Sequence, residues 1–394
     1  MKKLFVLTFG ILICTMGFAQ EQSDYVPFKE LFKGHFLAGV AVGGGRDYSG
    51  DMAKIIVDNY NTVTSENSMK PERILARQMR PRPQGQQGQN PPPMFGNFNR
   101  GPVELDTING LVYNWGGADA FANFARENNL KVRGHTLVWH SQTPASFFTD
   151  DEGNKLNKEQ LYERMENYMT AVMNRYKDVT FCWDVVNEAL SDYEGSIYRT
   201  ASPWYEVCGK DFIAQAFRTA HKVNPDVELI YNDYNVVNPA KLDRAITMLK
   251  ELVDADVPID GVGLQAHWSN DITAEMLQTA IDRISALGLK IQITELDITT
   301  YTSYHGDGAK SQVQETQPYS PVVADKLAET YKSLFEVLVK NSDKIESVTF
   351  WGLNDNRTWL NGFPVRGRRD YPMLLDGEMK PKKAYFEVKS VFMD

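Results

Sequence analysis

Residues 179–189 read VTFCWDVVNEA, a β-prone apolar run that ends in the polar pair Asn187 and Glu188. Residues 290–297 read KIQITELD and have the same character, with Glu295 following an apolar stretch. Nearly continuous apolar runs of this length are typical of strands in a parallel sheet, because such strands are buried on both faces. Both glutamates are therefore expected at the point where a parallel strand gives way to a loop.

Similar runs recur along the chain and alternate with amphipathic helical patterns. Strands are predicted at residues 37–42, 62–65, 131–137, 179–185, 227–231, 261–266, 290–294 and 347–350. Helices are predicted at residues 117–128, 158–175, 211–223, 241–255, 274–287 and 321–340, with a last helix around residues 385–388. Strands that alternate with helices in this way indicate an α/β protein with a (β/α)8 TIM barrel as a single domain.

Alternation along the sixth predicted strand assigns its two faces. The face expected to pack against helices carries the apolar residues Val262, Leu264 and Ala266. The face expected to point at the barrel axis carries Gly263, Gln265 and His267. In the seventh strand the same rule places Glu295 and Asp297 at the axis, and Gln292 and Thr294 toward the helices.

The carboxyl ends of all barrel strands meet at one face, so Glu188 and Glu295 are expected together there. Two carboxylates about 5.5 Å apart are what a retaining glycosidase uses, one to protonate the leaving oxygen and one to attack the anomeric carbon. His267 between Asp297 and Glu295 would keep Glu295 ionised, as a nucleophile requires. Glu188 must instead hold a proton near neutral pH, which partial burial and a neighbouring anion favour.

The ends of other predicted strands carry residues that suit a sugar cleft. Residues 133–142 read RGHTLVWHSQ, residues 66–70 read ENSMK, and Trp351 and Trp359 flank the eighth strand. Pyranose rings have apolar faces and polar rims, which match aromatic walls with polar donors. Asn187 is placed to donate to a sugar 2-hydroxyl.

Three histidines, His135, His140 and His267, could be read as a zinc set. No His-Glu-x-x-His motif and no pair of cysteines accompanies them, so we expect neither a metal nor another cofactor. Cys182 and Cys208 are expected to be buried thiols rather than a disulfide, because Cys182 lies inside an apolar strand.

Residues 1–19 are expected to be a secretory signal rather than part of the domain. Lys2 and Lys3 precede an apolar run at residues 4–13, and small residues precede a cleavage point before Gln20. An uncleaved anchor is disfavoured because the run is short for a membrane span, and a lipid anchor at Cys14 because a bulky isoleucine precedes it. The domain would then cover residues 20–394 of a protein exported to the periplasm or the medium.

Charge narrows the range of partners. The chain has 42 lysines and arginines against 51 acidic residues, a net charge of −9, and no basic cluster. This composition argues against binding nucleic acid, and against binding an anionic membrane surface after cleavage of the signal. We expect a monomer. Arg366, Arg368 and Arg369 follow the eighth strand and are expected in a solvated loop rather than in contact with acidic sugar decorations.

One segment interrupts the alternation. Residues 79–106 contain the run RPRPQGQQGQNPPP at residues 80–93, which has few groups to bury. We predict a low-complexity loop insertion after the second strand, over the carboxyl-end face of the barrel. A tolerated surface insertion and a substrate-contacting loop both remain open.

Six runs together resemble the signatures of glycoside hydrolase family 10, the endo-β-1,4-xylanases, and they occur in that family's order. They are TSENSMK at 64–70, RGHTLVWH at 133–140, WDVVNEA at 183–189, YNDYN at 231–235, GLQAH at 263–267 and ITELD at 293–297. The resemblance covers nearly all of residues 20–394. It implies retaining hydrolysis of internal β-1,4-xylosidic bonds in xylan or xylo-oligosaccharides, with Glu188 as acid/base and Glu295 as nucleophile.

The resemblance also implies roles for further residues. Those that would line the sugar site just before the cleavage point are Asn187, His135, Trp139, Gln265 and His267, with Asp297 orienting the histidine. Those that would contact the next sugar are Glu66, Asn67, Lys70 and Gln142. The aromatic walls would be Trp351 and Trp359, and Tyr234 would stack on the leaving-side sugar.

Two other functions are compatible with the residues alone. The first is a β-glycanase with the same barrel and carboxylates that acts on mannan, cellulose or mixed glucan. The second is an inactive carbohydrate-binding protein on a barrel scaffold, and the presence of both glutamates argues against it.

Overall fold

The computed structural model describes residues 24–75, 105–303 and 312–393. The predicted signal at residues 1–19 lies outside the described residues, as does most of the predicted insertion at 79–106. Both stay predictions. Within the described ranges, no helix is long and apolar enough to cross a membrane.

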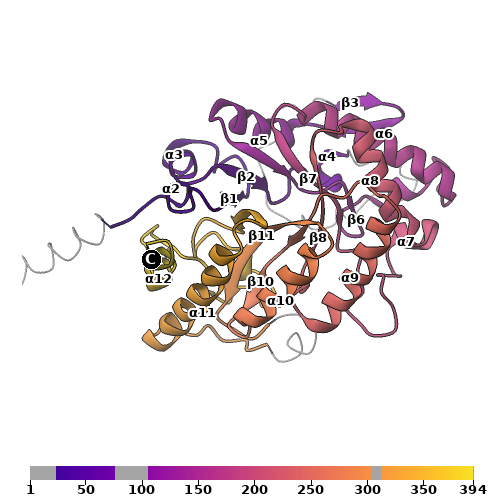
Figure 1. Cartoon of the computed structure of the whole chain (residues 1–394). Helices are drawn as coiled ribbons and strands as arrows, with labels where there is room; N and C mark the ends of the chain where they lie inside the picture. The colour runs from indigo at the N-terminus through magenta and orange to yellow at the C-terminus, as the bar shows by residue number, and fades with distance from the viewer. Residues whose placement is uncertain (1–23, 76–104, 304–311, 394) are drawn as a thin grey trace, which may run out of the picture.

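Eight parallel strand positions close into a barrel in the described part of the chain (Figure 1). The strands are β1 (Leu37–Val42), β2 (Thr62–Ser65), β5 (Lys131–Gly134), β7 (Thr180–Asn187), β8 (Glu228–Asp233), β9 (Gly261–Leu264), β11 (Lys290–Thr299) and β12 (Ile345–Phe350). Neighbours in the sequence are neighbours in the barrel, and β12 pairs with β1 to close it. The predicted TIM barrel is confirmed.

Two short strands continue the barrel at its carboxyl-end face. β6 (Val138–Trp139) pairs with β7, and β10 (His267–Ser269) pairs with β11. They continue β5 and β9 after short breaks. The third and sixth strands, predicted at 131–137 and 261–266, therefore end earlier than expected, and β6 and β10 begin just after the predicted bounds. The loops that follow β6 and β10 therefore start from residues that are hydrogen-bonded to the barrel strands β7 and β11.

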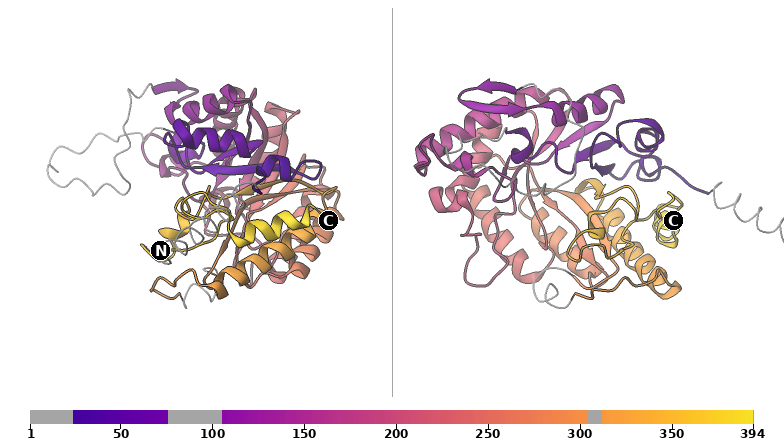
Figure 2. Two further views of the ribbon diagram at one scale, coloured as in Figure 1. Left: turned by 90° about the vertical axis from the view of Figure 1, so that its left-hand side faces the viewer. Right: turned by 180° about the vertical axis from the view of Figure 1, so that it is seen from behind.

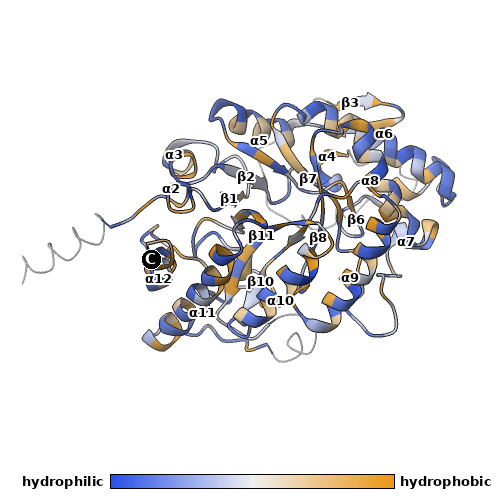
Figure 3. Cartoon of the chain, viewed as in Figure 1, coloured by the Kyte–Doolittle hydropathy of each residue, from blue (hydrophilic) through white to orange (hydrophobic). Residues whose placement is uncertain are grey.

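Helices follow the strands and cover the outside of the barrel (Figure 1). They are α2 (Phe28–Leu31), α3 (Gly50–Asn59), α4 (Pro71–Ile74), α5 (Gly116–Glu127), α6 (Lys158–Tyr176), α7 (Pro203–Cys208), α8 (Asp211–Val223), α9 (Pro239–Asp254), α10 (Ala274–Ser285), α11 (Pro321–Lys340) and α12 (Lys383–Val391). Hydrophilic residues dominate their outward faces and hydrophobic residues face the strands (Figure 3). In α8 the buried apolar residues recur every three or four positions, which is the spacing of one helix face: Phe212, Ile213, Ala216, Phe217 and Ala220.

Local signals set where the helices begin. The side chain of Asn157 accepts a hydrogen bond from the backbone N–H of Gln160, and the side-chain oxygen of Gln160 accepts one from the backbone N–H of Asn157, so α6 starts with a complete capping box. Pro321 occupies the first turn of α11, where its missing N–H costs nothing, and Ser320 caps that helix. Helices α8 and α11 have the predicted bounds.

The first and last described segments lie together (Figure 2). The hydroxyl of Tyr385 in α12 accepts a hydrogen bond from the backbone N–H of Val26 and donates one to its carbonyl oxygen, both at 2.7 Å. Phe28 packs against Tyr385 and Phe350 at ring-centroid distances of 5.7 and 5.0 Å. Aromatic packing therefore joins the last helix to the start of the domain.

The interior of the barrel is partly polar, which corrects the predicted faces of the seventh strand. Gln292 and Thr294 point toward the axis, not toward the helices. Gln292 Oε1 accepts a hydrogen bond from the buried Arg133 at 3.1 Å, and Thr294 donates to Asn232 at 2.7 Å. Burying a guanidinium requires partners of this kind, since an unpaired buried charge would be very unfavourable.

A β-bulge explains why Glu295 still faces the axis. Between Ile293 and Leu296 the register shifts, so that three steps along β11 match two steps along β12, from Val348 to Phe350. The extra residue reverses the alternation and turns Glu295 inward after Thr294. Strict alternation could not predict this, because a bulge adds a residue without a sequence mark.

A second bulge lies in β7. Asp184 and Val186 pair with the adjacent residues Ile230 and Tyr231 of β8, so one residue of β7 is extra. Both Asp184 and Asn187 consequently face the barrel interior, where their side chains are buried. Each strand that leads to a predicted catalytic glutamate thus has a bulge just before it.

A hairpin follows the predicted insertion. β3 (Leu105–Ile108) and β4 (Leu111–Asn114) pair antiparallel through Asn109 and Gly110, which both have positive φ (49° and 77°). This is the turn that an Asn-Gly pair favours, because both central residues of a type I′ turn are left-handed. The insertion prediction therefore ran two residues too far: Leu105 and Asp106 belong to β3.

The two cysteines in the described residues, Cys182 and Cys208, are both buried and free, as predicted. Burial raises the pKa of both thiols. They therefore stay protonated at neutral pH and act as small apolar side chains.

Candidate active site

The two glutamates meet at the carboxyl-end face through a chain of amides. Asn232 Nδ2 donates to Glu295 Oε1 and to Asn187 Oδ1, both at 2.9 Å. Gln265 Nε2 donates to Asn187 Oδ1 at 3.3 Å and to Glu188 Oε1 at 3.1 Å. Buried amides thus link one carboxylate to the other and set their relative position.

Glu295 is paired with a histidine. His267 Nε2 lies 3.2 Å from Glu295 Oε2, and His267 Nδ1 lies 3.0 Å from Asp297 Oδ1. The other oxygen of Asp297 accepts a hydrogen bond from Trp359 Nε1 at 2.8 Å. The imidazole is therefore held between two carboxylates, and the carboxylate behind it is itself held by an indole.

These contacts decide the protonation states. Burial alone would raise the pKa of Glu295, but the hydrogen bond from His267 and nearby positive charge outweigh it and lower the pKa to about 2. Burial alone would lower the pKa of His267, but Asp297 and Glu295 raise it to about 10. At neutral pH Glu295 is therefore a bare carboxylate beside an imidazolium.

Glu188 has a different environment. Its Oε2 accepts a hydrogen bond from Trp139 Nε1 at 2.9 Å, and its Oε1 accepts from Gln265 and from Asn187 Nδ2, the latter at 3.2 Å. His140 Nδ1 lies 4.0 Å from Oε2. Burial, together with Arg199, lowers the pKa of His140 to about 4, so this imidazole is neutral. Among the described contacts the hydrogen-bond donors on Glu188 are all neutral, whereas Glu295 is hydrogen-bonded to His267; the ammonium of Lys70 interacts electrostatically with both carboxylates.

The backbone of Glu188 is also unusual. It has a φ of +56°, in the left-handed region that side chains with a Cβ disfavour by roughly 1–2 kcal/mol. Ala266 and Gln142, near the ends of β9 and β6, have positive φ values of 60° and 47°. Such backbone geometry is typical of functional sites, where surrounding contacts maintain it.

A polar cluster lies next to this pair. Lys70 Nζ donates to Gln142 Oε1 at 3.1 Å and lies 4.9 Å from the centre of the Trp139 ring. Gln142 Nε2 in turn donates to Asn67 Oδ1 at 3.4 Å. Burial lowers the pKa of Lys70 and raises that of Glu66. The cluster combines donors and acceptors, as recognition of sugar hydroxyls requires.

Aromatic rings enclose the centre of the site. Trp351 is perpendicular to both His135 and His267, at ring-centroid distances of 5.5 and 6.1 Å. Trp359 lies 5.0 Å from His267 and stacks on Phe363 at 5.2 Å. Phe363 was not among the predicted site residues, because a single aromatic residue in a loop gives no signal by itself.

Three buried polar residues of the site were also missed by the sequence analysis. Asn232 follows an apolar run just as Asn187 does, so its position could have identified it. Asp184 Oδ1 accepts a hydrogen bond from Arg133 Nη2. Asp184 Oδ2 lies 2.7 Å from His135 Nδ1. The signal for Arg133 and Asp184 was their placement inside apolar strands, where a charge needs a partner.

The arginines after the eighth strand do not all lie in a solvated loop, which corrects that expectation for one of them. Arg368 is 2% exposed, donates to Gln312 Oε1 at 3.0 Å and to the carbonyl oxygen of Val313 at 2.6 Å, and lies 3.8 Å from the centre of the Tyr301 ring. It joins two loops of the carboxyl-end face. Arg366 and Arg369 are exposed.

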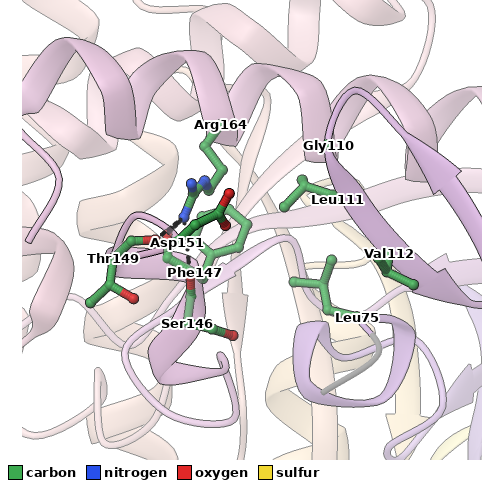
Figure 4. Close-up of a pocket in the computed structure, with 9 residues that line it drawn as sticks. All are labelled: Leu75, Gly110, Leu111, Val112, Ser146, Phe147, Thr149, Asp151 and Arg164. Atoms are coloured by element: carbon green, nitrogen blue, oxygen red, sulfur yellow. Dashed lines mark hydrogen bonds between the residues drawn. The ribbon is translucent and has the colours of Figure 1, made fainter. Parts of the chain in front are cut away.

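A separate pocket lies under the β3–β4 hairpin (Figure 4). It is lined by Leu75, Gly110, Leu111, Val112, Ser146, Phe147, Thr149, Asp151 and Arg164. Arg164 Nη1 donates to three backbone oxygens there, those of Ser146, Phe147 and Thr149. Because this donor is already used and neither glutamate lines the pocket, it is a structural junction between α6 and the loop before it.

A parallel barrel with paired carboxylates, amide donors and aromatic walls at its carboxyl-end face defines a glycoside hydrolase. Comparison with known families identifies which one. The chain belongs to glycosyl hydrolase family 10, whose model matches residues 27–391.

Individual relatives agree. A Beta-1,4-xylanase of Dictyoglomus thermophilum is 36% identical, over 98% of this chain and 97% of that protein. An Endo-1,4-beta-xylanase of Geobacillus stearothermophilus is 42% identical, over 66% of this chain and 77% of that protein. The crystal structure of an endo-1,4-beta-xylanase from Caldicellulosiruptor owensensis matches with a TM-score of 0.78 at 36% identity, over 92% and 99% of the two chains. A mutant solved in complex with xylotriose matches with a TM-score of 0.79 at 35% identity, over 93% and 99%.

Proposed function

We propose that the chain hydrolyses xylan by a double displacement in which Glu295 is the nucleophile and Glu188 the general acid and base. Endo-1,4-β-xylanase activity with retention of configuration is the activity of family 10, and the protein is an endo-1,4-β-xylanase. The observation that supports the roles is the contrast between the two environments. Glu295 is hydrogen-bonded to the imidazolium of His267, whereas the hydrogen-bond donors on Glu188, from Trp139 and Gln265, are neutral.

In the first step a carboxylate oxygen of Glu295 bonds to the anomeric carbon of the sugar. The bond from that carbon to the leaving oxygen breaks, and Glu188 gives its proton to this oxygen. The product of the step is a glycosyl ester on Glu295. His267 stays protonated throughout, so it stabilises the carboxylate both before attack and when it leaves again.

In the second step water replaces the leaving sugar. Glu188, now ionised, takes a proton from the water, whose oxygen bonds to the anomeric carbon while the ester bond to Glu295 breaks. Two inversions give net retention. The same carboxyl group therefore serves as acid and then as base, which requires that it be held on the leaving-group side in both steps.

The neighbouring residues position the substrate. Asn187 Oδ1 accepts two hydrogen bonds from the protein and one N–H of Nδ2 donates to Glu188, so the second N–H of Nδ2 is the one that would donate to a sugar 2-hydroxyl. The cluster of Lys70, Gln142 and Asn67 would hold the next sugar, with Glu66 beside it. The xylotriose complex of a relative supports a substrate of several xylose units. The relatives named above as xylanases support xylan as the substrate.

Trapping the ester tests the roles directly. Incubation with 2,4-dinitrophenyl 2-deoxy-2-fluoro-β-xylobioside should inactivate the enzyme and leave one fluoro-sugar on Glu295, because the fluorine slows the second step more than the activated first step. Mass spectrometry of proteolytic peptides locates the label. A label on Glu188, or inactivation with no label, would contradict the assignment.

His267→Asn should change the pH dependence of activity. Without the imidazolium, burial of Glu295 is opposed by less positive charge, so the pKa of Glu295 rises above about 2. Because only the ionised carboxylate attacks, the acid limb of kcat/KM on xylo-oligosaccharides shifts to higher pH. His221→Asn, an exposed histidine in α8, is the control. Acid limbs that coincide in all three proteins would refute the electrostatic role.

The same variant should change the pH dependence of stability. The folded-state pKa of His267, about 10, is above the ordinary value of 6.5. Its contribution to the free energy of unfolding is therefore complete below pH 6.5 and is lost as the pH rises through 10. We expect the Tm to fall more between pH 7 and 10 in the wild type than in His267→Asn, measured by calorimetry.

A further inference from the structure

The left-handed backbone of Glu188 is held from both sides. Its N–H donates to the carbonyl oxygen of Asn232 at 2.9 Å, and its carbonyl oxygen accepts a hydrogen bond from Arg199 Nε at 3.0 Å. The bond to Asn232 belongs to the strand ladder, whereas Arg199 comes from the loop that follows. The peptide between Glu188 and Ala189 is thus held at two atoms: its carbonyl oxygen by Arg199, and its N–H, which donates to the hydroxyl of Tyr231 in β8 at 3.1 Å.

The same guanidinium reaches the ring expected on the leaving-group side. Arg199 Nη2 donates to the hydroxyl of Tyr234 at 2.8 Å and to Asp192 Oδ2 at 3.0 Å. Tyr234 in turn donates to Asp192 Oδ2 at 2.5 Å. One planar cation thus connects the main chain of Glu188 to Tyr234 through fixed donor positions, as only a guanidinium can.

Asp192, which binds the guanidinium of Arg199, is also bound by a buried lysine. Lys241, 3% exposed at the start of α9, donates to Asp192 Oδ1 at 2.9 Å, forms an ion pair with Asp233 at 2.9 Å, and lies 3.5 Å from the centre of the Tyr234 ring. Burial alone would raise the pKa of Asp192, but Lys241 and Tyr234 lower it to about 2. Arg199 is therefore held by a carboxylate that stays charged at any pH well above about 2.

The loop itself brings Arg199 back to Glu188. The backbone N–H of Arg199 donates to the carbonyl oxygen of Ala189 at 2.8 Å, and Leu190 pairs antiparallel with Tyr198. The arginine side chain is 19% exposed, so solvent does not replace these bonds freely. The backbone and the side chain of Arg199 therefore bind the carbonyl oxygens of two consecutive residues, Ala189 and Glu188.

We propose that Arg199 is a positioning residue that holds the acid/base Glu188 and the ring of Tyr234 in one geometry, so that the proton donor stays aligned with the leaving oxygen. This inference rests on the proposed function of Glu188. Arg199 does not touch the reacting atoms: it acts by keeping the peptide of Glu188 in the left-handed region. Without Arg199 the carbonyl oxygen of Glu188 loses its side-chain donor, the backbone there is held only at the N–H groups of Glu188 and Ala189, and the carboxyl group moves out of line with the leaving group.

The test compares substrates that need the acid with a substrate that does not. Arg199→Met removes the donors, and Arg199→Lys keeps the charge but not the planar fork. The substrates are xylohexaose, whose leaving sugar needs a proton, and 2,4-dinitrophenyl β-xylobioside, whose leaving group does not. The matched control is Arg218→Met, an exposed arginine in α8 bonded only to the carbonyl oxygen of Ala255 among the described contacts.

We expect Arg199→Met to lower kcat/KM on xylohexaose by about 30-fold and on the dinitrophenyl substrate by less than about 3-fold, since general acid catalysis contributes about 10²–10⁴-fold. Arg199→Lys should show a smaller loss with the same selectivity, and it carries the test if the methionine variant does not fold. Arg218→Met should match the wild type. Equal losses on both substrates would overturn the proposal.

A double-mutant cycle separates this inference from the assignment of Glu188. In a Glu188→Ala background Arg199→Met should lose most of its effect on xylohexaose, because Glu188 is no longer there to be positioned and only the contact with Tyr234 remains. Full additivity would overturn the positioning role. If Glu188→Ala alone shows no difference between the substrates, the proposed function of Glu188 fails. If it does and Arg199→Met does not, only the present inference fails.

Discussion

Glu295→Ala should reduce hydrolysis of xylan on the order of 10⁵-fold, because removal of a catalytic nucleophile leaves only binding and the remaining electrostatics. No covalent ester can form without the carboxylate, and water cannot attack from the buried position of Glu295, which is 4% exposed. The loss should be the same for xylan and for activated aryl xylobiosides, since both need the nucleophile.

Reducing-sugar release from xylan and dinitrophenol release from the aryl substrate measure this loss. Glu206→Ala, which removes an exposed glutamate paired with Lys155 at 3.1 Å, is the control and should keep wild-type rates. Activity of Glu295→Ala above about one hundredth of the wild type on either substrate would rule out the nucleophile role.

Glu188→Ala should give a different pattern. On xylan the loss should be about 10³-fold, the usual contribution of a general acid. On 2,4-dinitrophenyl β-xylobioside the first step should keep most of its kcat/KM, because dinitrophenolate leaves without a proton. The second step then becomes slow, since no base activates water.

Azide distinguishes this outcome from a general loss of structure. As a small anion that needs no general base, it can enter the space left by the carboxylate and attack the glycosyl ester. It should therefore raise kcat on the aryl substrate and yield a β-xylobiosyl azide, detectable by mass spectrometry. Glu336→Ala, an exposed position on α11, should respond to azide no more than the wild type. Near wild-type xylan hydrolysis by Glu188→Ala would refute the acid/base role.

Much of the fold could be predicted because it depends on local patterns. Apolar runs of strand length and helical periodicity located every barrel strand, and α8 and α11 have the predicted bounds. The position of Glu188 at the end of β7 also follows from the chain alone, since a polar residue after a buried run marks where a strand leaves the core. The same rule was wrong for Glu295, which lies inside β11 because that strand continues to Thr299. The Asn109-Gly110 turn could have been predicted by the same kind of rule.

The bulges in β7 and β11 could not be predicted in this way. They depend on how one strand registers with its neighbour, and that register is a property of the closed barrel. Alternation counted along β11 alone pointed Gln292 and Thr294 at the helices, whereas the barrel turns them inward to satisfy Arg133 and Asn232. A residue's face is decided by its partners as well as by its position in the run.

The sequence by itself determined the barrel, the order of its strands and the two strands that lead to the glutamates, because hydrophobic periodicity and turn chemistry are local. The sequence already led us to expect that His267 keeps Glu295 ionised. Only the tertiary structure gives the contacts by which positive charge outweighs the burial of Glu295, and only it shows that Arg199 reaches the backbone of Glu188. The pKa of each group and the alignment of its side chain depend on residues that are distant in the sequence. Burial and neighbouring opposite charges shift a pKa in opposite directions, so the outcome is decided only when the closed barrel brings these residues together.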